Sequence, residues 1–134
     1  MGLTLTEIFT ILIIHFFADF VIQTDKQAKG KSKNWNDLLA HTFNYSLVWF
    51  ILGTIYSIIS NIYTDFTYLF DWWIVWKFTL ITFIAHTITD YFTSRLNSRL
   101  WAEGKVHNFF VSVGADQVYH YIQLFLTYYY LKTL

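Results

Sequence analysis

Histidine and aspartate recur in this sequence four positions apart. Three of these pairs are His15 with Asp19, His86 with Asp90, and Asp116 with His120. In an α-helix, residues i and i+4 lie on the same face, so each pair would present an imidazole and a carboxylate in one direction. These two groups are common ligands of zinc, manganese and iron in proteins. The spacing therefore indicates a metal site, provided that the fold brings several pairs together.

Other polar residues extend this pattern. His41 adds another imidazole, with Asp37 four positions before it, so the order His-x3-Asp and then Asp-x3-His occurs twice along the chain. We interpret this order as a weak internal repeat. Gln23 and Gln117 have side chains that can orient metal ligands through hydrogen bonds. We therefore expect both amides beside the site.

Four long apolar segments must position these residues. A helix needs about 20 mainly apolar residues to cross the hydrocarbon core of a bilayer. Long continuous runs favour helices over the short alternating strands of a membrane barrel. We therefore predict an all-α fold, a single domain over residues 1–134 that forms a four-helix transmembrane bundle. The predicted spans are residues 3–24, 36–60, 70–95 and 108–132.

The composition also favours a membrane protein. The chain is 55% apolar and 13% charged, whereas about 25% of the residues in a soluble domain are charged. The formal net charge is zero, so a nucleic acid would find no electrostatic attraction. Cysteine is absent, which excludes disulfides and thiolate metal sites. Membrane lipids are the expected partners, and the sequence leaves a homo-oligomer open.

The connections between the spans predict an orientation. Four lysines lie between the first two spans, and Arg99 and Lys105 lie between the last two. The connection at residues 61–69 has no basic residue and carries Asp65. Cytoplasmic loops of membrane proteins are enriched in lysine and arginine. We therefore expect a multi-pass protein of the inner, cytoplasmic membrane with both termini on the outer side.

This orientation places the three histidine–aspartate pairs and His41 in one layer, the inner half of the bundle. A carboxylate at membrane depth costs about 2.5–3.5 kcal/mol on insertion scales, so these acids should be paired or bind a cation. Zinc needs three or four ligands, so seven suffice for one or two divalent ions; we favour zinc, with manganese or iron as alternatives. The predicted metal ligands are His15, Asp19, His41, His86, Asp90, Asp116 and His120.

Each pair could instead be a hydrogen bond within its own helix, because buried polar groups usually satisfy one another. For one isolated pair this explanation would be preferred. Three pairs together with His41 at one depth favour the metal site.

Three functions are compatible with such a site. The first is a metal-dependent hydrolase of a lipid or phosphoester, because a bound metal lowers the pKa of its water to about 7. The second is transport of a metal ion or a proton. The third is a non-catalytic membrane interaction module whose polar core only holds the helices together. We favour the hydrolase, because seven ligands exceed what a structural zinc ion needs.

A hydrolase would also need groups that move protons and bind the substrate. Arg95 and Arg99 would bind a phosphate at the inner face. Whether Asp37 and His107 belong to the site is left open by the sequence. The predicted catalytic residues are Asp90, Asp116, Gln23, Gln117 and His107.

Five motifs follow one another along the chain: His15-Phe-Phe-Ala-Asp19-Phe-Val-Ile-Gln23, Leu38-Leu-Ala-His41, His86-Thr-Ile-Thr-Asp90-Tyr, Val106-His107-Asn108-Phe109-Phe110 and Gly114-Ala-Asp116-Gln117-Val-Tyr-His120. Together they resemble a family of small membrane proteins of unknown function, found in bacteria and their phages. The resemblance implies a shared polar set of the seven predicted ligands with Gln23 and Gln117, and it does not clearly include Asp37. A looser likeness to membrane-bound, metal-dependent hydrolases with helical His/Asp sites implies hydrolysis.

Overall fold

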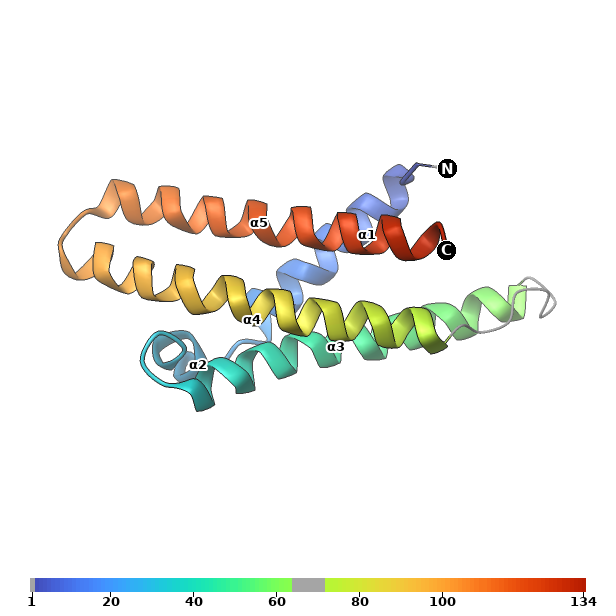
Figure 1. The fold of residues 1–134 in the computed structure, drawn as a ribbon, viewed down its shortest axis with the longest axis horizontal. Helices are drawn as coiled ribbons and strands as arrows, with labels where there is room; N and C mark the ends of the chain where they lie inside the picture. The colour runs from blue at the N-terminus through green and yellow to red at the C-terminus, as the bar shows by residue number, and fades with distance from the viewer. Residues whose placement is uncertain (1, 64–71) are drawn as a thin grey trace.

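The protein is described by a computed structural model, which covers residues 2–63 and 72–134 (Figure 1). Within these ranges the chain is helical and has no strand, so the predicted all-α class is confirmed. The expected outer connection with Asp65 falls mostly outside the described residues. The elements are α1 (Leu5–Phe16), the π-helical η1 (Phe17–Val21), α2 (Asp25–Gly30), α3 (Trp35–Tyr63), α4 (Trp72–Ala102) and α5 (Val106–Lys132).

Three long helices, α3, α4 and α5, run side by side, and α1 crosses them obliquely (Figure 1). Lys132 Nζ lies 2.7 Å from Glu7 Oε1, which joins the end of α5 to the start of α1. The short helix α2 and the α4–α5 connection lie at the opposite end of the molecule (Figure 1). The basic connections therefore share one end of the bundle.

Local capping explains where the short elements begin. Thr4 starts α1 and Thr24 starts α2, each in a reciprocal capping box with the residue three positions later. The α2–α3 turn is tight at Gly30, where an added Cβ would collide with the carboxylate of Asp37. Asp37 also accepts a hydrogen bond from Asn34 Nδ2 at 2.8 Å. Asp37 thus stabilises the turn. The acidic neighbours of His41 are Asp19 and Asp90, which come from other helices, so the predicted internal repeat is not reflected in the contacts of His41.

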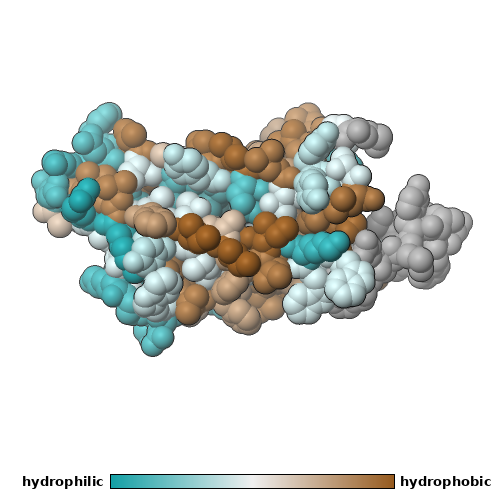
Figure 2. Space-filling view, viewed as in Figure 1, coloured by the Kyte–Doolittle hydropathy of each residue, from teal (hydrophilic) through white to brown (hydrophobic). Residues whose placement is uncertain are grey.

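The interior of the molecule is unusually polar. Among the described residues, thirteen buried side chains are polar or charged and eight are apolar. Apolar side chains cover the outside instead, with Phe92 66% exposed, Phe110 64% and Leu126 63%. Figure 2 shows hydrophobic side chains along the middle of one face and hydrophilic side chains at the end formed by α2 and the α4–α5 connection. This distribution is the reverse of that in a soluble domain.

One stretch of the described residues, Trp35–Ile59 in α3, is long and apolar enough to cross a membrane by length and hydropathy. It has 25 residues and a mean hydropathy of 1.4. The α-helical part of α1 has only 12 residues, which is too short to cross a bilayer. Helices α4 and α5 are long enough, but their ionisable residues lower their mean hydropathy. A single candidate span is therefore found, and the four-span arrangement stays a prediction.

Candidate metal centre

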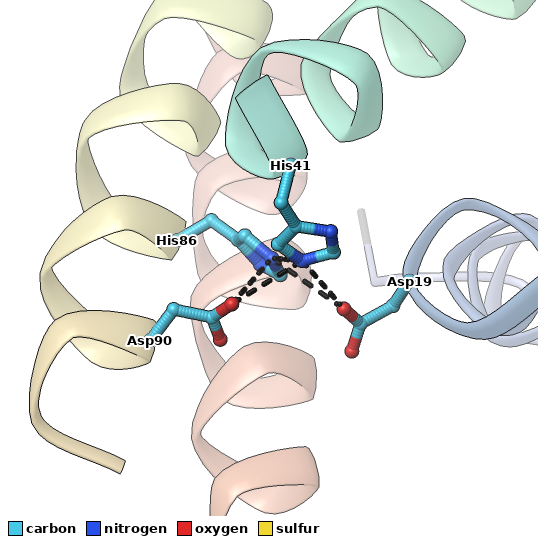
Figure 3. Close-up of side chains that lie close together, drawn as sticks. All are labelled: Asp19, His41, His86 and Asp90. Atoms are coloured by element: carbon cyan, nitrogen blue, oxygen red, sulfur yellow. Dashed lines mark hydrogen bonds and ion pairs between the residues drawn. The ribbon is translucent and has the colours of Figure 1, made fainter. Parts of the chain in front are cut away.

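Four buried side chains point toward one another (Figure 3). Asp19 comes from η1, His41 from α3, and His86 and Asp90 from consecutive turns of α4. All four are at most 4% exposed. Three segments far apart in the sequence thus present two imidazoles and two carboxylates to one point.

The distances among these four groups suit a small cation. His41 Nε2 lies 3.1 Å from Asp19 Oδ1, 3.1 Å from His86 Nε2 and 3.2 Å from Asp90 Oδ2. His86 Nε2 lies 3.6 Å from Asp19 Oδ1 and 3.7 Å from Asp90 Oδ2. Ligands at zinc–nitrogen or zinc–oxygen distances of about 2.0–2.2 Å in a tetrahedron are about 3.4 Å apart. The five distances given for the first ligand group, Asp19, His41, His86 and Asp90, are therefore close to those of a tetrahedral site.

A second ligand group consists of Asp19, Asp116 and His120. His120 Nε2 lies 3.3 Å from Asp116 Oδ1, and also 3.3 Å from Asp90 Oδ1. Asp19 belongs to both groups, and Asp90 connects them through its two oxygens. The arrangement therefore offers places for two cations joined by carboxylates.

Each member of the second group has a buried atom without a hydrogen bond. These atoms are Asp19 Oδ1, Asp116 Oδ1 and His120 Nε2. A buried polar atom without a partner is costly, and a carboxylate oxygen especially so. Their neighbours stand at 3.1–3.3 Å but outside hydrogen-bond geometry. Cations held by the two ligand groups would supply the partners that these atoms lack, so the residues fit metal ions.

The π-helical segment η1 presents Asp19. Its widened turn is closed by a hydrogen bond from Ile22 N to Phe17 O of 3.0 Å, five residues apart. Such turns in otherwise α-helical segments are frequent at functional sites. Asp19 thereby reaches His41 and His86 with one oxygen, while its other oxygen lies 3.7 Å from His15 Nε2.

His15 lies beside the two ligand groups and is in neither. Its Nδ1 is 2.7 Å from the hydroxyl of Tyr45, and its Nε2 is 2.8 Å from Gln117 Oε1. Both ring nitrogens are thus engaged by hydrogen bonds from α3 and α5. The structure brings six of the seven predicted ligands into the groups and gives the seventh a supporting position.

The two glutamines lie where they can orient the ligands. Gln23 Nε2 is 2.8 Å from His41 Nδ1, and a half-turn of this amide would place its oxygen there as the acceptor that the Nδ1–H of a metal-bound His41 needs. Gln117 Nε2 donates to Asp116 Oδ2 at 3.1 Å and to Asp19 Oδ2 at 3.3 Å. A hydrogen bond to the far nitrogen or oxygen of a ligand fixes its orientation and basicity.

Two functional candidates were missed by the sequence reasoning. Lys31 Nζ donates to Asp90 Oδ2 at 2.8 Å. Burial alone would lower the pKa of Lys31, but the Asp90 and Asp19 carboxylates outweigh it and raise that pKa above its ordinary value. Tyr45 stacks on His86 with ring centroids 3.8 Å apart. Tyr45 follows His41 by four positions and so shares its helix face, a signal that could have found it; no spacing signals Lys31.

A cavity of about 700 Å³ leads from the site toward the α2–α3 turn. Asp19, Asp116 and Gln117 line its inner part. The predicted phosphate-binding arginines do not line it. Arg95 lies 3.7 Å from the ring centre of Tyr91, and Arg99 Nε lies 3.8 Å from Glu103.

His107 is exposed at the start of α5, and it also lies outside the residues that line the cavity. The assignments of His107, Arg95 and Arg99 to the site stay predictions.

Comparison with known proteins places the chain in a family. The model of a family described as "Protein of unknown function (DUF3307)" matches residues 8–134, and the chain belongs to this family. No curated protein and no solved structure matches it. The matched range contains every residue of the two ligand groups.

Proposed function

We propose that this DUF3307 protein is a metal-dependent phosphoester hydrolase embedded in a membrane as a four-helix bundle. The observation that carries the proposal is the pair of buried ligand groups that share Asp19 beside a cavity lined by lysines. Zinc is the favoured ion because the first ligand group has tetrahedral spacing, and manganese or iron would accept the same ligands.

The distribution of side chains supports the membrane part of the proposal. An apolar exterior around a polar interior is what a bundle in lipid requires, because ionisable residues must face away from the hydrocarbon. The lysines of the α2–α3 turn and Lys105 share the end opposite the Glu7–Lys132 pair. The positive-inside rule assigns the lysine end to the cytoplasm and both termini to the outer side.

The chemistry would proceed at the floor of the cavity. When bound, a divalent metal supplies a water of lowered pKa and polarises a phosphoryl oxygen. In the hydrolysis itself, a water oxygen would add to phosphorus, the ester P–O bond would break, and the departing alkoxide would take up the proton that the water gives up. Asp116 lines the cavity with an oxygen that has no hydrogen bond. With an ion in the first ligand group alone, this oxygen would stay free of metal, so Asp116 would be placed to accept the proton and pass it to the leaving group.

Metal analysis of the detergent-purified protein tests the proposal, together with phosphate release from phosphomonoesters. We expect one or two zinc, manganese or iron ions per chain, and activity that a chelator removes and the metal restores. Asp90→Asn should lose metal and activity, whereas Asp25→Asn, on the exposed start of α2, should retain both. A folded protein that binds no metal after reconstitution with each ion would rule the proposal out.

One observation favours proton or metal transport as a second candidate. Gln123 Nε2 donates to Thr127 at 3.0 Å and to Thr82 at 3.3 Å, and both threonines are buried. Thr82 precedes His86 by one helical turn. Polar groups thus continue from the site toward the Glu7–Lys132 end of the bundle.

Flux assays in proteoliposomes test this candidate. Gln123→Leu should abolish proton or metal flux and leave metal content unchanged. Gln27→Leu, in the separate α2 capping box, provides the comparison. Vesicles that show no flux above empty liposomes, with metal-loaded protein, would exclude transport.

A further inference from the structure

The cavity beside the metal centre has walls of two kinds. One wall is polar and comes from α2, the α2–α3 turn and α4, with Lys29, Lys31, Lys33 and Asn97. The other wall is apolar and comes from η1, the end of α4 and the start of α5. Its residues are Phe20, Trp101, Phe109, Phe110 and Val113. A ligand that fills this space would contact charged and apolar surface together.

The polar wall is suited to an anion. Within residues 2–63 and 72–134, the ammonium groups of Lys29 and Lys33 form no ion pair, and Lys31 is held by Asp90. Ser98 Oγ donates to Ser32 Oγ at 2.8 Å, which fixes the turn against α4. Three lysines are therefore held around one opening, and a phosphate is the anion that such a cluster neutralises.

The apolar wall is continuous with the outer surface of the bundle. Phe110 is 64% exposed and Phe20 47% exposed, although both line the cavity. In a lipid environment this wall would meet hydrocarbon chains, so a chain could lie on it without leaving the bilayer. A small water-soluble phosphoester would leave this wall uncovered.

We propose that the cavity binds a phosphate-bearing amphiphile, with its head group among Lys29, Lys31 and Lys33 and its hydrocarbon chain against Phe20 and Phe110. The inference names the substrate class of the proposed hydrolase, and it rests on that function only for turnover. Asp19 and Asp116 line the same cavity. A phosphate bound by the lysines would therefore lie toward the shared carboxylate of the two ligand groups.

Ligand binding to metal-free full-length protein in a neutral detergent, measured by native mass spectrometry, tests the head-group contacts. The probes are short-chain phosphatidic acid, the diacylglycerol with the same chains, and glycerol 3-phosphate. Phosphatidic acid should bind at least about tenfold more tightly than either of the others. Lys29→Gln combined with Lys33→Gln should weaken it by about tenfold, and Lys26→Gln with Lys77→Gln, which alters two exposed lysines outside the cavity, should not.

A second variant pair tests the apolar wall. Phe110→Ser should weaken binding of phosphatidic acid several-fold and leave that of glycerol 3-phosphate unchanged. Phe92→Ser removes an equally exposed ring from α4, outside the cavity, and should have no effect on either probe.

The outcomes separate the cavity from the reaction. Equal binding of diacylglycerol would overturn the phosphate contacts, and equal binding of glycerol 3-phosphate would overturn the amphiphile. If phosphatidic acid binds as expected but metal-loaded protein releases no phosphate from it, the binding site for an amphiphile is supported and the proposed hydrolysis is contradicted. If glycerol 3-phosphate is hydrolysed while phosphatidic acid does not bind, the hydrolase proposal is supported and the amphiphile site is contradicted.

Discussion

Lys31 and Asp90 form an ion pair in the interior, with Nζ 2.8 Å from Oδ2 across 59 positions of sequence. The same Asp90 oxygen lies 3.2 Å from His41 Nε2, within the first ligand group. The ammonium therefore occupies a position next to the one that a cation would take, and the two positive charges would repel each other. Lys31 contacts a residue of the first ligand group and also lines the cavity, so cation binding in the group and ligand binding in the cavity would both act on the same ammonium group.

Removing the Lys31 charge should favour the metal. Lys31→Gln is expected to raise zinc affinity by about tenfold or more, because a like charge beside the ion is lost. Competition with a chromophoric chelator measures this, and Lys29→Gln is the comparison because its ammonium has no carboxylate partner among the described residues. Unchanged zinc affinity in Lys31→Gln would mean that the ammonium and the ion do not compete.

The same variant should lower the stability of the metal-free protein in a pH-dependent manner. The pKa of Lys31 is raised in the folded protein, because its carboxylate neighbours outweigh burial. The stabilisation is thus fully present below the ordinary lysine pKa and is lost as the pH rises through the higher folded value. Thermal unfolding should show a difference between wild type and Lys31→Gln at neutral pH that shrinks in strong alkali. A difference that is constant with pH would contradict this assignment.

Asp19 should control both ligand groups, because it belongs to each. If two ions bind, Asp19→Asn should lose both, whereas His120→Ala should retain the ion of the first group. Elemental analysis of the two variants beside wild type measures the stoichiometry. Equal losses in the two variants would show that the groups act as a single site.

The hydroxyl of Tyr45 should stabilise the fold through His15. Tyr45→Phe leaves His15 Nδ1 without its 2.7 Å partner in the interior, and we expect a loss of about 1–3 kcal/mol in the free energy of unfolding. Chemical denaturation in mild detergent measures it, with Tyr119→Phe, an exposed residue of α5, as control. Metal content should stay at the wild-type value, since Tyr45 is in neither ligand group.

Gly30 should be required for the position of the α2–α3 turn. Gly30→Ala would force its Cβ into the carboxylate of Asp37 and so shift the segment that carries Lys31. We expect weaker binding of phosphatidic acid and a lower unfolding temperature. Gly114→Ala on α5 meets nothing within 4 Å and should behave as wild type.

The residues that lie close together could be predicted because both signals used, the i, i+4 spacing and the charge of the connections, can be read directly from neighbouring positions in the sequence. The i, i+4 spacing gave each pair a common face, and the distribution of lysine and arginine aligned the pairs in depth. Asp19, His41, His86, Asp90, Asp116 and His120 are accordingly close together in the structure. The helical class followed from the long apolar runs in the same way.

Other features depend on tertiary contacts that no local pattern encodes. The π-helical turn at Asp19 differs from an α-helical turn by one hydrogen-bond step, which apolar periodicity does not report. Lys31 reaches Asp90 through a long flexible side chain, so its partner depends on how the turn packs. Arg95 donates to the backbone oxygen of Tyr91, one helical turn earlier, at 2.7 Å, a contact that the distribution of charge along the chain does not report.

The division of the ligands among the helices has a consequence for the order of assembly. Asp19, His41, His86 and Asp90 all precede α5 in the chain, whereas Asp116 and His120 lie on it. During synthesis, every residue of the first ligand group is therefore made before α5 leaves the ribosome. Under the proposed function, a newly made chain would capture its first ion early, and α5 would add the remaining ligands afterwards.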